Sequence, residues 1–351
     1  MKINAHITIT PFWPPATDDS ENYFLYPAQI ANRSGFTAKI FVYSGKASRQ
    51  ITYGGILINF YKSIISLFKN IPSNSTVHVH TGHRKMLIVI ILLLTFKQKC
   101  RIIWTPHTSF EFKTDKPYDL PVDIFKILKP LFNRLTAIIN ISPKEYDHML
   151  KLGYGNIKYI PLVIIDKPFK KYSCKKNKRS FRLLFVGGDR PVKGLLNTIK
   201  AFRIFTQNTK LSCQLGILGQ VDRNFIKTNK ILLTKNIIFY GHVPHFSQEF
   251  FRIFSLADGY INNSFCEGSP IAAYEATAAG LKLLLSNLST LRSIYESNAL
   301  YHNPDKPEEL AKNMLIISNQ SRKRKKNILT NTLLKQVSLE NFTHSYTSLI
   351  C

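Results

Sequence analysis

Two glutamates in one short segment are the side chains best suited to bind a ligand. Glu267 and Glu275 are separated by seven residues, which begin Gly-Ser-Pro. Ser269 suits a helix N-cap, Pro270 suits the first helical position, and Gly280 suits the position after a helix end. We therefore expect Glu267 on a loop between a strand and a helix, and Glu275 inside that short helix.

The start of this expected helix favours an anion. The first amides of a helix lack intrahelical acceptors, and the helix dipole favours negative charge beside them. Here these amides belong to Gly268, Ser269, Ile271 and Ala272. A phosphate at this position, with a hydroxyl-binding carboxylate on either side, would suit a nucleotide sugar. A capped surface helix with two solvated acids fits the same pattern, so the segment alone leaves both interpretations open.

A second segment, residues 185–194, reads Phe-Val-Gly-Gly-Asp-Arg-Pro-Val-Lys-Gly. An expected strand enters a glycine-containing loop and then a helix, a geometry that presents amides and the cations Arg190 and Lys193 to a phosphate. The segment is not a Walker loop, because no Ser or Thr follows Lys193. On its own it is equally consistent with a glycine turn that carries surface cations.

The elements that position these segments alternate along the chain. Short apolar runs are separated by helical patterns, which predicts parallel βαβ units and sheets covered on both faces. Ligands bind such sheets at the carboxyl ends of the strands. The expected strands are residues 2–10, 38–43, 76–80, 101–105 and 137–141, followed by 182–186, 214–218, 236–240, 259–262 and 282–286.

The basic stretch 166–180 has almost no aliphatic residues and is the expected linker between two α/β domains. A chain of 351 residues also exceeds one ordinary core. We expect one domain at 1–165, a second at 166–335, and a C-terminal helix at 336–351 that packs back toward the first domain. The most apolar run, 86–96, is shorter than the roughly 20 residues that span a bilayer, and it predicts a buried core helix.

The combined order of the motifs resembles a known enzyme family. It is similar to the C-terminal half of the retaining GT-B glycosyltransferases of family GT4, the glycosyl transferases group 1. The resemblance covers roughly residues 181–295, while the N-terminal half is similar only in layout. It implies a GT-B fold, in which two Rossmann-like domains with parallel sheets face a central cleft. The motifs that carry it are Gly187, Lys193-Gly194, Ala257-Asp258, Ser264, Glu267, Glu275 and Gly280.

The resemblance also implies a role for each motif residue, and an N-terminal domain that binds the acceptor. Glu275 would bind the donor ribose, and Lys193 the donor diphosphate. Glu267 would contact the donor sugar, and His107 matches a histidine that faces this sugar, so these two are the expected catalytic residues. The activity would be retaining transfer of a sugar from a nucleotide-diphosphate donor. The other expected donor-binding residues are Arg190, Gly187, Gly188, Gly268, Ser269, Pro270 and Ile271.

The chain departs from the family pattern at three places. Gly188 stands where the family has Arg, and Arg190 is expected to reach the same phosphate. Residues 12–17 replace a Gly-Gly loop, and residues 162–166 replace an interdomain Asn-Gly-Val-Asp. These differences leave the donor site intact and the acceptor side open. Because no Asp-x-Asp triplet is present to hold a metal ion, we expect a metal-independent enzyme without a cofactor.

Several histidines follow expected strands. His80 and His83 are candidate acceptor contacts, because they lie at a strand end. Of His78 and His80 we expect only one to face the cleft, with His78 packed in the interior. The lone histidines are expected to be structural or at the surface: His242, His245 and His302.

The formal net charge is +27, and both halves of the chain are basic. Such a field attracts phosphate-bearing substrates, anionic lipid surfaces or nucleic acid. The stretch 124–134 fits either a basic amphipathic helix on an anionic membrane or an ordinary helix packed on the sheet. We expect a lipid-linked glycan acceptor, as in the synthesis of a bacterial surface polysaccharide such as O-antigen or capsule, at the cytoplasmic face of the plasma membrane.

Two other functions remain open. A sugar-nucleotide epimerase would use the same fold. A nucleic-acid-binding protein would need a basic stripe with interleaved aromatic residues or a recognised module. Neither is present, so no specific nucleic-acid partner is expected. The five cysteines are widely spaced and include no Cys-x-x-Cys pair, which favours a reducing cytosol over a disulfide framework or a zinc site. We see no pattern of a signal peptide at the N-terminus.

Overall fold

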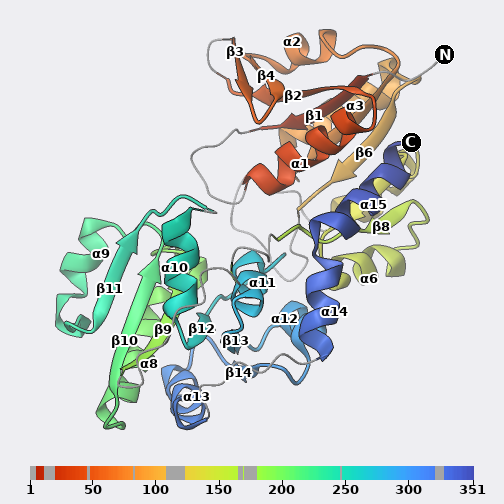
Figure 1. Ribbon diagram of the computed structural model, residues 1–351. Helices are drawn as coiled ribbons and strands as arrows, with labels where there is room; N and C mark the ends of the chain where they lie inside the picture. Colours follow the sequence, from red (N-terminus) through yellow and green to blue (C-terminus); the bar gives the residue numbers. More distant parts are fainter. Residues whose placement is uncertain are drawn as a thin grey trace. The chain divides into compact units, whose positions relative to one another are not determined.

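The structure is a computed structural model that describes residues 5–11, 20–45, 48–81, 84–107, 123–164, 169, 180–245, 247–320 and 328–351. The chain divides into two compact units (Figure 1). The first unit comprises Met1–Val163 and Leu339–Cys351, and the second comprises Ile164–Ser338. The C-terminal helix expected over 336–351 is α15 (Leu339–Ile350), which belongs to the first unit. The helix before it, α14 (Ile328–Gln336), belongs to the second unit.

The first unit is built on an eight-stranded sheet with the order β3-β4-β2-β1-β5-β6-β7-β8. All of its neighbouring strands are parallel except β3 and β4. The five strands expected in this half appear as β1, β2, β5, β6 and β7. The strands are β1 (Ala5–Thr10), β2 (Thr37–Tyr43), β3 (Arg49–Tyr53), β4 (Ile56–Tyr61), β5 (Ser75–His80), β6 (Arg101–Thr105), β7 (Ala137–Asn140) and β8 (Ile157–Tyr159).

Strands β3 and β4 form an antiparallel hairpin that the apolar pattern did not predict. Gly54 and Gly55 connect them, with φ angles of 55° and 77°. Two consecutive left-handed residues give a turn whose twist suits a hairpin, and glycine adopts that conformation without strain. Most of β3 is exposed, so it lacks an apolar run, and the Gly-Gly pair is the sequence signal that could have identified the hairpin.

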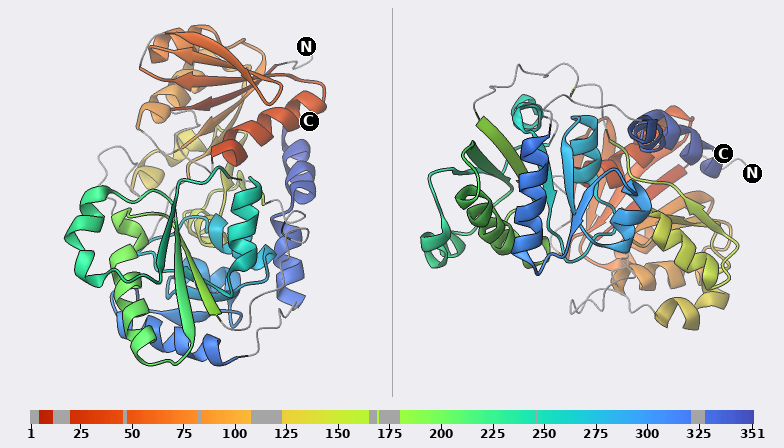
Figure 2. Two further views of the ribbon diagram at one scale, coloured as in Figure 1. Left: turned by 60° about the vertical axis from the view of Figure 1, so that its left-hand side comes forward. Right: turned by 90° about the horizontal axis from the view of Figure 1, so that it is seen from below.

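Helices cover both faces of this sheet (Figure 2). One face packs against α2 (Ile64–Lys69), α3 (Arg84–Phe96), α4 (Asp123–Ile127), α5 (Lys129–Phe132) and α6 (Pro143–Lys151). The other face packs against α1 (Ser20–Arg33) and α15. On this second face the buried residues of β1 and β5 include histidines and threonines, contrary to the uniformly apolar strands that were expected. Within the described residues, no helix combines the length and apolar content that crossing a bilayer requires.

The second unit contains a six-stranded, wholly parallel sheet with the order β11-β10-β9-β12-β13-β14. Helices α8 (Leu195–Gln207) and α13 (Pro307–Asn319) pack on one face, and α10 (Gln248–Leu256) and α11 (Ile271–Ala278) lie on the other (Figure 2). The unit also contains α9 (Arg223–Thr228), α12 (Ser289–Tyr295) and α14. The strands are β9 (Ser180–Val186), β10 (Ser212–Leu218), β11 (Ile237–Gly241), β12 (Gly259–Asn262), β13 (Lys282–Ser286) and β14 (Leu300–His302).

Candidate functional site

A glycine-rich loop follows β9 and brings three chain segments together. Gly188 has φ of 62°, and a Cβ atom there would lie 2.1 Å from the carbonyl oxygen of Gln220. Gly194 has φ of 67° and begins α8, and its added Cβ would lie 2.3 Å from the carbonyl oxygen of Asn263. Only glycine fits both positions, because of the positive φ and the close backbone. The loops after β9, β10 and β12 therefore meet at one edge of the sheet.

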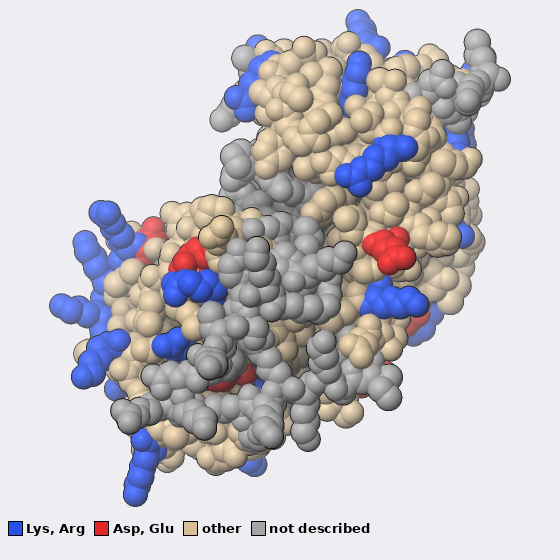
Figure 3. All heavy atoms as spheres, in the orientation of Figure 1, with Lys and Arg blue, Asp and Glu red and all other residues tan. Residues whose placement is uncertain are grey.

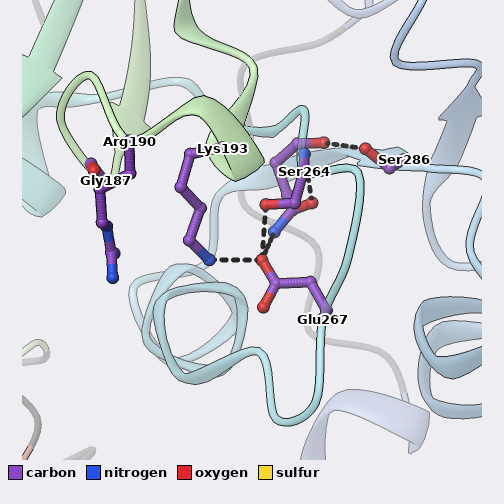
Figure 4. Close-up of polar contacts among 7 residues, drawn as sticks. Gly187, Arg190, Lys193, Ser264, Glu267 and Ser286 are labelled. Carbon is purple, nitrogen blue, oxygen red and sulfur yellow. Dashed lines mark hydrogen bonds and ion pairs between the residues drawn. The ribbon is translucent and has the colours of Figure 1, made fainter. Parts of the chain in front are cut away.

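Lys193 lies between these glycines and points toward the loop after β12. Its Nζ atom donates to Oε1 of Glu267 at 2.6 Å. The same oxygen accepts hydrogen bonds from Asn262 Nδ2 at 2.8 Å and from Ser264 Oγ at 2.6 Å (Figure 4). The backbone amide of Phe265 also donates to the carbonyl of Val192 at 2.8 Å. The two motif segments that the sequence singled out thus form one hydrogen-bonded group.

The carboxyl group of Glu267 is ionised in this setting. Its side chain is 7% exposed and that of Lys193 is 19% exposed. Burial alone would raise the pKa of the Glu267 carboxyl. The charge of Lys193 and the hydrogen bonds from Lys193, Ser264 and Asn262 outweigh burial, so the pKa lies below its ordinary value. Glu267 is therefore a fixed negative charge whose Oε1 atom is saturated by donors.

Helix α11 begins one residue later than the sequence predicted. Pro270 is the N-cap and makes no side-chain cap bond, so the expectation that Ser269 caps this helix is wrong. The amide of Ile271, expected to be unpaired, donates to the carbonyl of Ser269 at 3.0 Å. None of the described residues accepts a hydrogen bond from the amides of Gly268, Ser269 and Ala272. Three amides without an acceptor among the described residues thus lie at this helix N-terminus, an arrangement that the expected anion site requires.

Glu275 lies on α11, and its side chain is 3% exposed. Its Oε1 atom contacts Nε2 of His245, which belongs to the loop between β11 and α10. The sequence assigned His245 only a structural or surface role. The signal that could have identified it is topological. Because β11 is parallel to β9 and β12, residues after its carboxyl end gather at the same edge of the sheet.

Arg190, the expected substitute for the family Arg, is exposed. Its Nε atom donates to the carbonyl of Gly187 at 3.2 Å, which holds the side chain along the glycine loop (Figure 4). Asp258, another motif residue, has a structural contact instead. Its Oδ2 atom accepts from the amide of Arg182 at 3.0 Å, so it joins the start of β12 to β9. No group of three or more His, Cys, Asp or Glu side chains in the described ranges could hold a metal ion.

The first unit contains a separate group of imidazoles, which we call the histidine cluster: His6, His78 and His80, which are buried, and His107, which is half-buried. The rings of His78 and His80 lie 3.9 Å apart. We expected only one of these two side chains to face the cleft. That expectation is wrong, because residues two apart on a strand point to the same side of the sheet. His80 is 2% exposed, and its Nδ1 atom lies 3.2 Å from Nε2 of His107. His83 lies outside the described residues.

Comparison with known proteins places these sites in a family context. Residues 166–331, nearly all of the second unit, match the family model described as glycosyl transferases group 1. No curated protein sequence matches the chain. The solved structures with a similar fold include an E. coli trehalose-6-phosphate protein bound with UDP-2-fluoro glucose, with 13% identity and a TM-score of 0.72 over 98% of both chains.

Two further structures share the fold at similar length. A sucrose-phosphate synthase from Thermosynechococcus elongatus has 15% identity and a TM-score of 0.73, over 99% of this chain and 98% of that chain. HepE of Anabaena, in complex with UDP and glucose, has 11% identity and a TM-score of 0.74 over 98% of both chains. At these identities the likeness shows the fold, which is GT-B. With a glycosyl transferases group 1 domain as its second unit and a GT-B fold over nearly its whole length, the chain is a glycosyltransferase.

Proposed function

We propose that this glycosyltransferase takes a sugar from a nucleotide-diphosphate donor and transfers it with retention. The observation that carries the proposal is the carboxylate of Glu267. Lys193, Asn262 and Ser264 all donate to its Oε1 atom, and no described residue donates to Oε2. A carboxylate fixed through one oxygen presents the other as an acceptor, which suits a hydroxyl of the donor sugar.

The nucleotide part of the donor would bind around α11. Glu275 would accept the ribose hydroxyls, with His245 holding its carboxylate in place. The diphosphate would lie at the helix N-terminus beside the unpaired amides. Lys193 would then exchange its contact with Glu267 for a phosphate oxygen, since its Nζ atom already lies at this edge of the sheet. Two of the similar structures contain UDP or a UDP sugar, so uridine diphosphate sugars are the first donors to test.

The chemical step would be driven by charge stabilisation. The bond between the anomeric carbon and the diphosphate oxygen breaks. The acceptor hydroxyl bonds to that carbon, and its proton leaves with the diphosphate. Lys193, Arg190 and the helix amides would stabilise the charge that develops on the leaving group, a role that needs no metal ion. His107 would contact the transferred sugar. Retention is supported by the motif resemblance and by a trehalose-6-phosphate synthase of similar fold, at 12% identity, that is described as transferring with retention.

The acceptor is proposed to be a lipid-linked glycan of a bacterial surface polysaccharide, at the cytoplasmic face of the membrane. Residues 22–110 contain no Asp or Glu and eleven Lys or Arg. On the face drawn in Figure 3, Lys and Arg atoms are spread over much of the described surface, and Asp and Glu atoms appear in only a few places. On α2 and α3 themselves, Ile65, Ile88 and Phe96 are 65%, 47% and 69% exposed. Exposed apolar residues among cations suit the interface of an anionic bilayer.

The stretch 124–134 supports membrane contact less well. Phe125 of α4 and Phe132 of α5 are fully buried, and the ring of Phe125 stacks on Trp104 at 5.5 Å. This stretch is therefore a helical segment packed on the sheet, which was the alternative left open by the sequence. Ile127 differs from these buried phenylalanines, because its apolar side chain is 72% exposed. The proposed membrane face is accordingly α2 and α3.

A transfer assay tests the proposed function. The protein is incubated with single UDP sugars and a bacterial lipid-linked glycan fraction, and the nucleoside diphosphate released is measured with and without EDTA. We expect release only when donor and acceptor are both present, unchanged by EDTA, and a product whose anomeric configuration by NMR equals that of the donor. Conversion of the donor without acceptor would instead indicate the epimerase, and an inverted linkage would rule out retention.

A further inference from the structure

Among the described residues, the histidine cluster is a group of buried and half-buried titratable side chains that the proposed donor site does not use. It lies on the face of the first sheet that α1 and α15 cover. Tyr346 of α15 joins it, and its ring is stacked on that of His78 with centroids 5.4 Å apart. The rings of His80 and His107 are stacked at 5.5 Å with an interplanar angle of 24°. Together with the His78–His80 contact at 3.9 Å, these ring contacts run from α15 to His107, two residues after the end of β6.

Hydrogen bonds connect the same residues. The hydroxyl of Tyr346 lies 2.8 Å from Nε2 of His6 and 2.7 Å from Nδ1 of His78. The opposite ring nitrogen of His78, Nε2, lies 2.8 Å from Oγ1 of Thr105. His80 continues the group through its Nδ1 atom, 3.2 Å from Nε2 of His107. Tyr346 and Thr105 therefore fix His78 from both of its nitrogens, and His78 packs directly on His80.

The protonation of the cluster follows from its burial. Loss of hydration lowers the pKa of all four imidazoles, to about 3 for His6 and His107, so each ring is neutral and carries one N–H. Nε2 of His80 is buried, and no described residue bonds to it. A buried N–H without an acceptor is costly, which favours the proton of His80 on Nδ1. Nδ1 of His80 then donates to Nε2 of His107, and the proton of His107 is on Nδ1.

The backbone of His107 is held in an unfavourable conformation. Its φ is 52°, a left-handed value that residues other than glycine rarely adopt. Thr81, which follows β5, has φ of 79° and is fixed by two hydrogen bonds: its amide donates to the carbonyl of Thr105 at 2.8 Å, and its carbonyl accepts from Nε1 of Trp104 at 3.2 Å. Such conformations are unfavourable and persist only where neighbouring contacts hold them.

We propose that His80 is a positioning residue for His107, and that Tyr346 and His78 hold His80 in place from the side of α15. The hydrogen bond from His80 sets the tautomer and the ring orientation of His107. A metal-bound histidine is oriented in the same way by the group that hydrogen-bonds its other ring nitrogen. The role of His107 toward the transferred sugar rests on the proposed function. The C-terminal helix thereby supports the contact between His107 and the transferred sugar through Tyr346, His78 and His80.

The test compares His80→Leu, His80→Asn and Tyr346→Phe. The amide nitrogen of Asn lies where Nδ1 of His80 lies, so His80→Asn keeps a donor to His107, whereas His80→Leu removes it. We expect His80→Leu to lower kcat about 10- to 100-fold, by analogy with the loss of such supporting partners, with donor KM changed less than about twofold. His80→Asn should recover most of kcat, and Tyr346→Phe should give an intermediate loss. The matched control is Thr76→Val, which removes a buried hydroxyl from the same face; it should leave kcat unchanged.

Nitrogen NMR of histidine-labelled protein supplies a readout that is independent of activity. The ring signals of His107, assigned by their loss in His107→Ala, should report one neutral tautomer in the parent protein and a tautomer mixture in His80→Leu. If His107→Ala keeps full transfer, the proposed role of His107 fails, while the ring signals still test its positioning. If His107→Ala abolishes transfer but His80→Leu keeps both kcat and the parent ring signals, the positioning proposal is overturned.

Discussion

At the scale of single residues, Glu267 is the charge around which the donor site is arranged. Its Oε1 atom accepts hydrogen bonds from Lys193, Asn262 and Ser264. Replacement by Gln keeps the shape of the side chain but removes its charge. If the Gln oxygen takes the place of Oε1, an NH2 donor replaces the acceptor Oε2. We expect Glu267→Gln to lower kcat about 100-fold, the order seen when one charge-stabilising group is removed. Affinity for the nucleoside diphosphate should change less than about threefold.

Calorimetric titration with UDP and steady-state kinetics separate these two effects. Glu249→Gln is the matched control, because Glu249 is an exposed acid of the same unit whose carboxylate forms an ion pair with Arg252 on the surface of α10. A Glu267→Gln protein with the parent kcat would show that this carboxylate does not contact the reacting sugar.

A second residue-scale prediction concerns the glycine loop. Gly188→Ala introduces a Cβ atom 2.1 Å from the carbonyl oxygen of Gln220 at a positive φ, and the backbone must shift. We expect the free energy of unfolding to fall by more than about 1 kcal/mol, together with weaker nucleotide binding. Gly155→Ala is the control, since no atom lies within 4 Å of its added Cβ. Equal denaturant midpoints for the two variants would contradict this account of the loop.

The spacing of motifs predicted which residues meet in the second unit, but not every contact. Lys193 and Glu267 were expected at one site, and they form an ion pair. The contact between Glu275 and His245 was missed, because it depends on which strands are neighbours, and sequence order alone does not give the order of strands in a sheet. The N-cap was misplaced because Pro270 itself precedes the first helical residue.

At the scale of elements, the apolar periodicity predicted most of the inner parallel strands, but it missed the buried β4 and three of the strands at sheet edges. Strands β6, β12 and β13 have the expected bounds, since each is a continuous apolar run between two neighbours. Strand β3 lies at the sheet edge and is mostly exposed, and the short β8 and β14 were not predicted either. An exposed edge strand needs no apolar run, so periodicity cannot reveal it.

Helix α3 carries the element-scale prediction. Its inner side buries Met86, Val89 and Leu93, whereas Ile88 and Phe96 are exposed. Binding to vesicles that contain phosphatidylglycerol should weaken at least tenfold in the double variant Ile88→Ser, Phe96→Ser, because burial of these side chains contributes roughly 1.5–3 kcal/mol each. Higher salt should weaken it further. Cosedimentation measures the effect.

The control for α3 is Ile231→Ser in the second unit, where Ile231 is 90% exposed and also lies among cations of that unit. This variant should bind vesicles as the parent does. Equal loss in both proteins, or binding to uncharged phosphatidylcholine vesicles as tight as to anionic ones, would contradict a membrane face on α2 and α3.

At the scale of the whole molecule, the histidine cluster makes stability dependent on pH. Burial lowers the pKa of His6, His78, His80 and His107 in the folded chain, whereas the unfolded value is 6.5. Below pH 6.5 the unfolded chain binds more protons than the folded one, so stability falls as the pH drops toward 3. The loss reaches about 1.4 kcal/mol per pH unit for each histidine.

Tryptophan fluorescence reports this loss in the first unit, because both tryptophans of the chain, Trp13 and Trp104, lie in the sequence of that unit. Trp104 is fully buried, so its emission should shift to longer wavelength as the pH falls from 7 to 4. Emission at pH 4 that equals emission at pH 7 would show that the cluster does not limit acid stability.

The central claim is that the edge of the second sheet binds a nucleotide-diphosphate sugar through Glu275 and Lys193. Titration calorimetry of UDP and its sugars against the parent protein, Glu275→Ala and the control Glu249→Ala tests it most directly. We predict saturable binding with one site for the parent and the control, and a loss of at least tenfold in affinity for Glu275→Ala, because the ribose hydroxyls lose a buried charged acceptor. Unchanged affinity in Glu275→Ala would contradict the placement of the donor on α11.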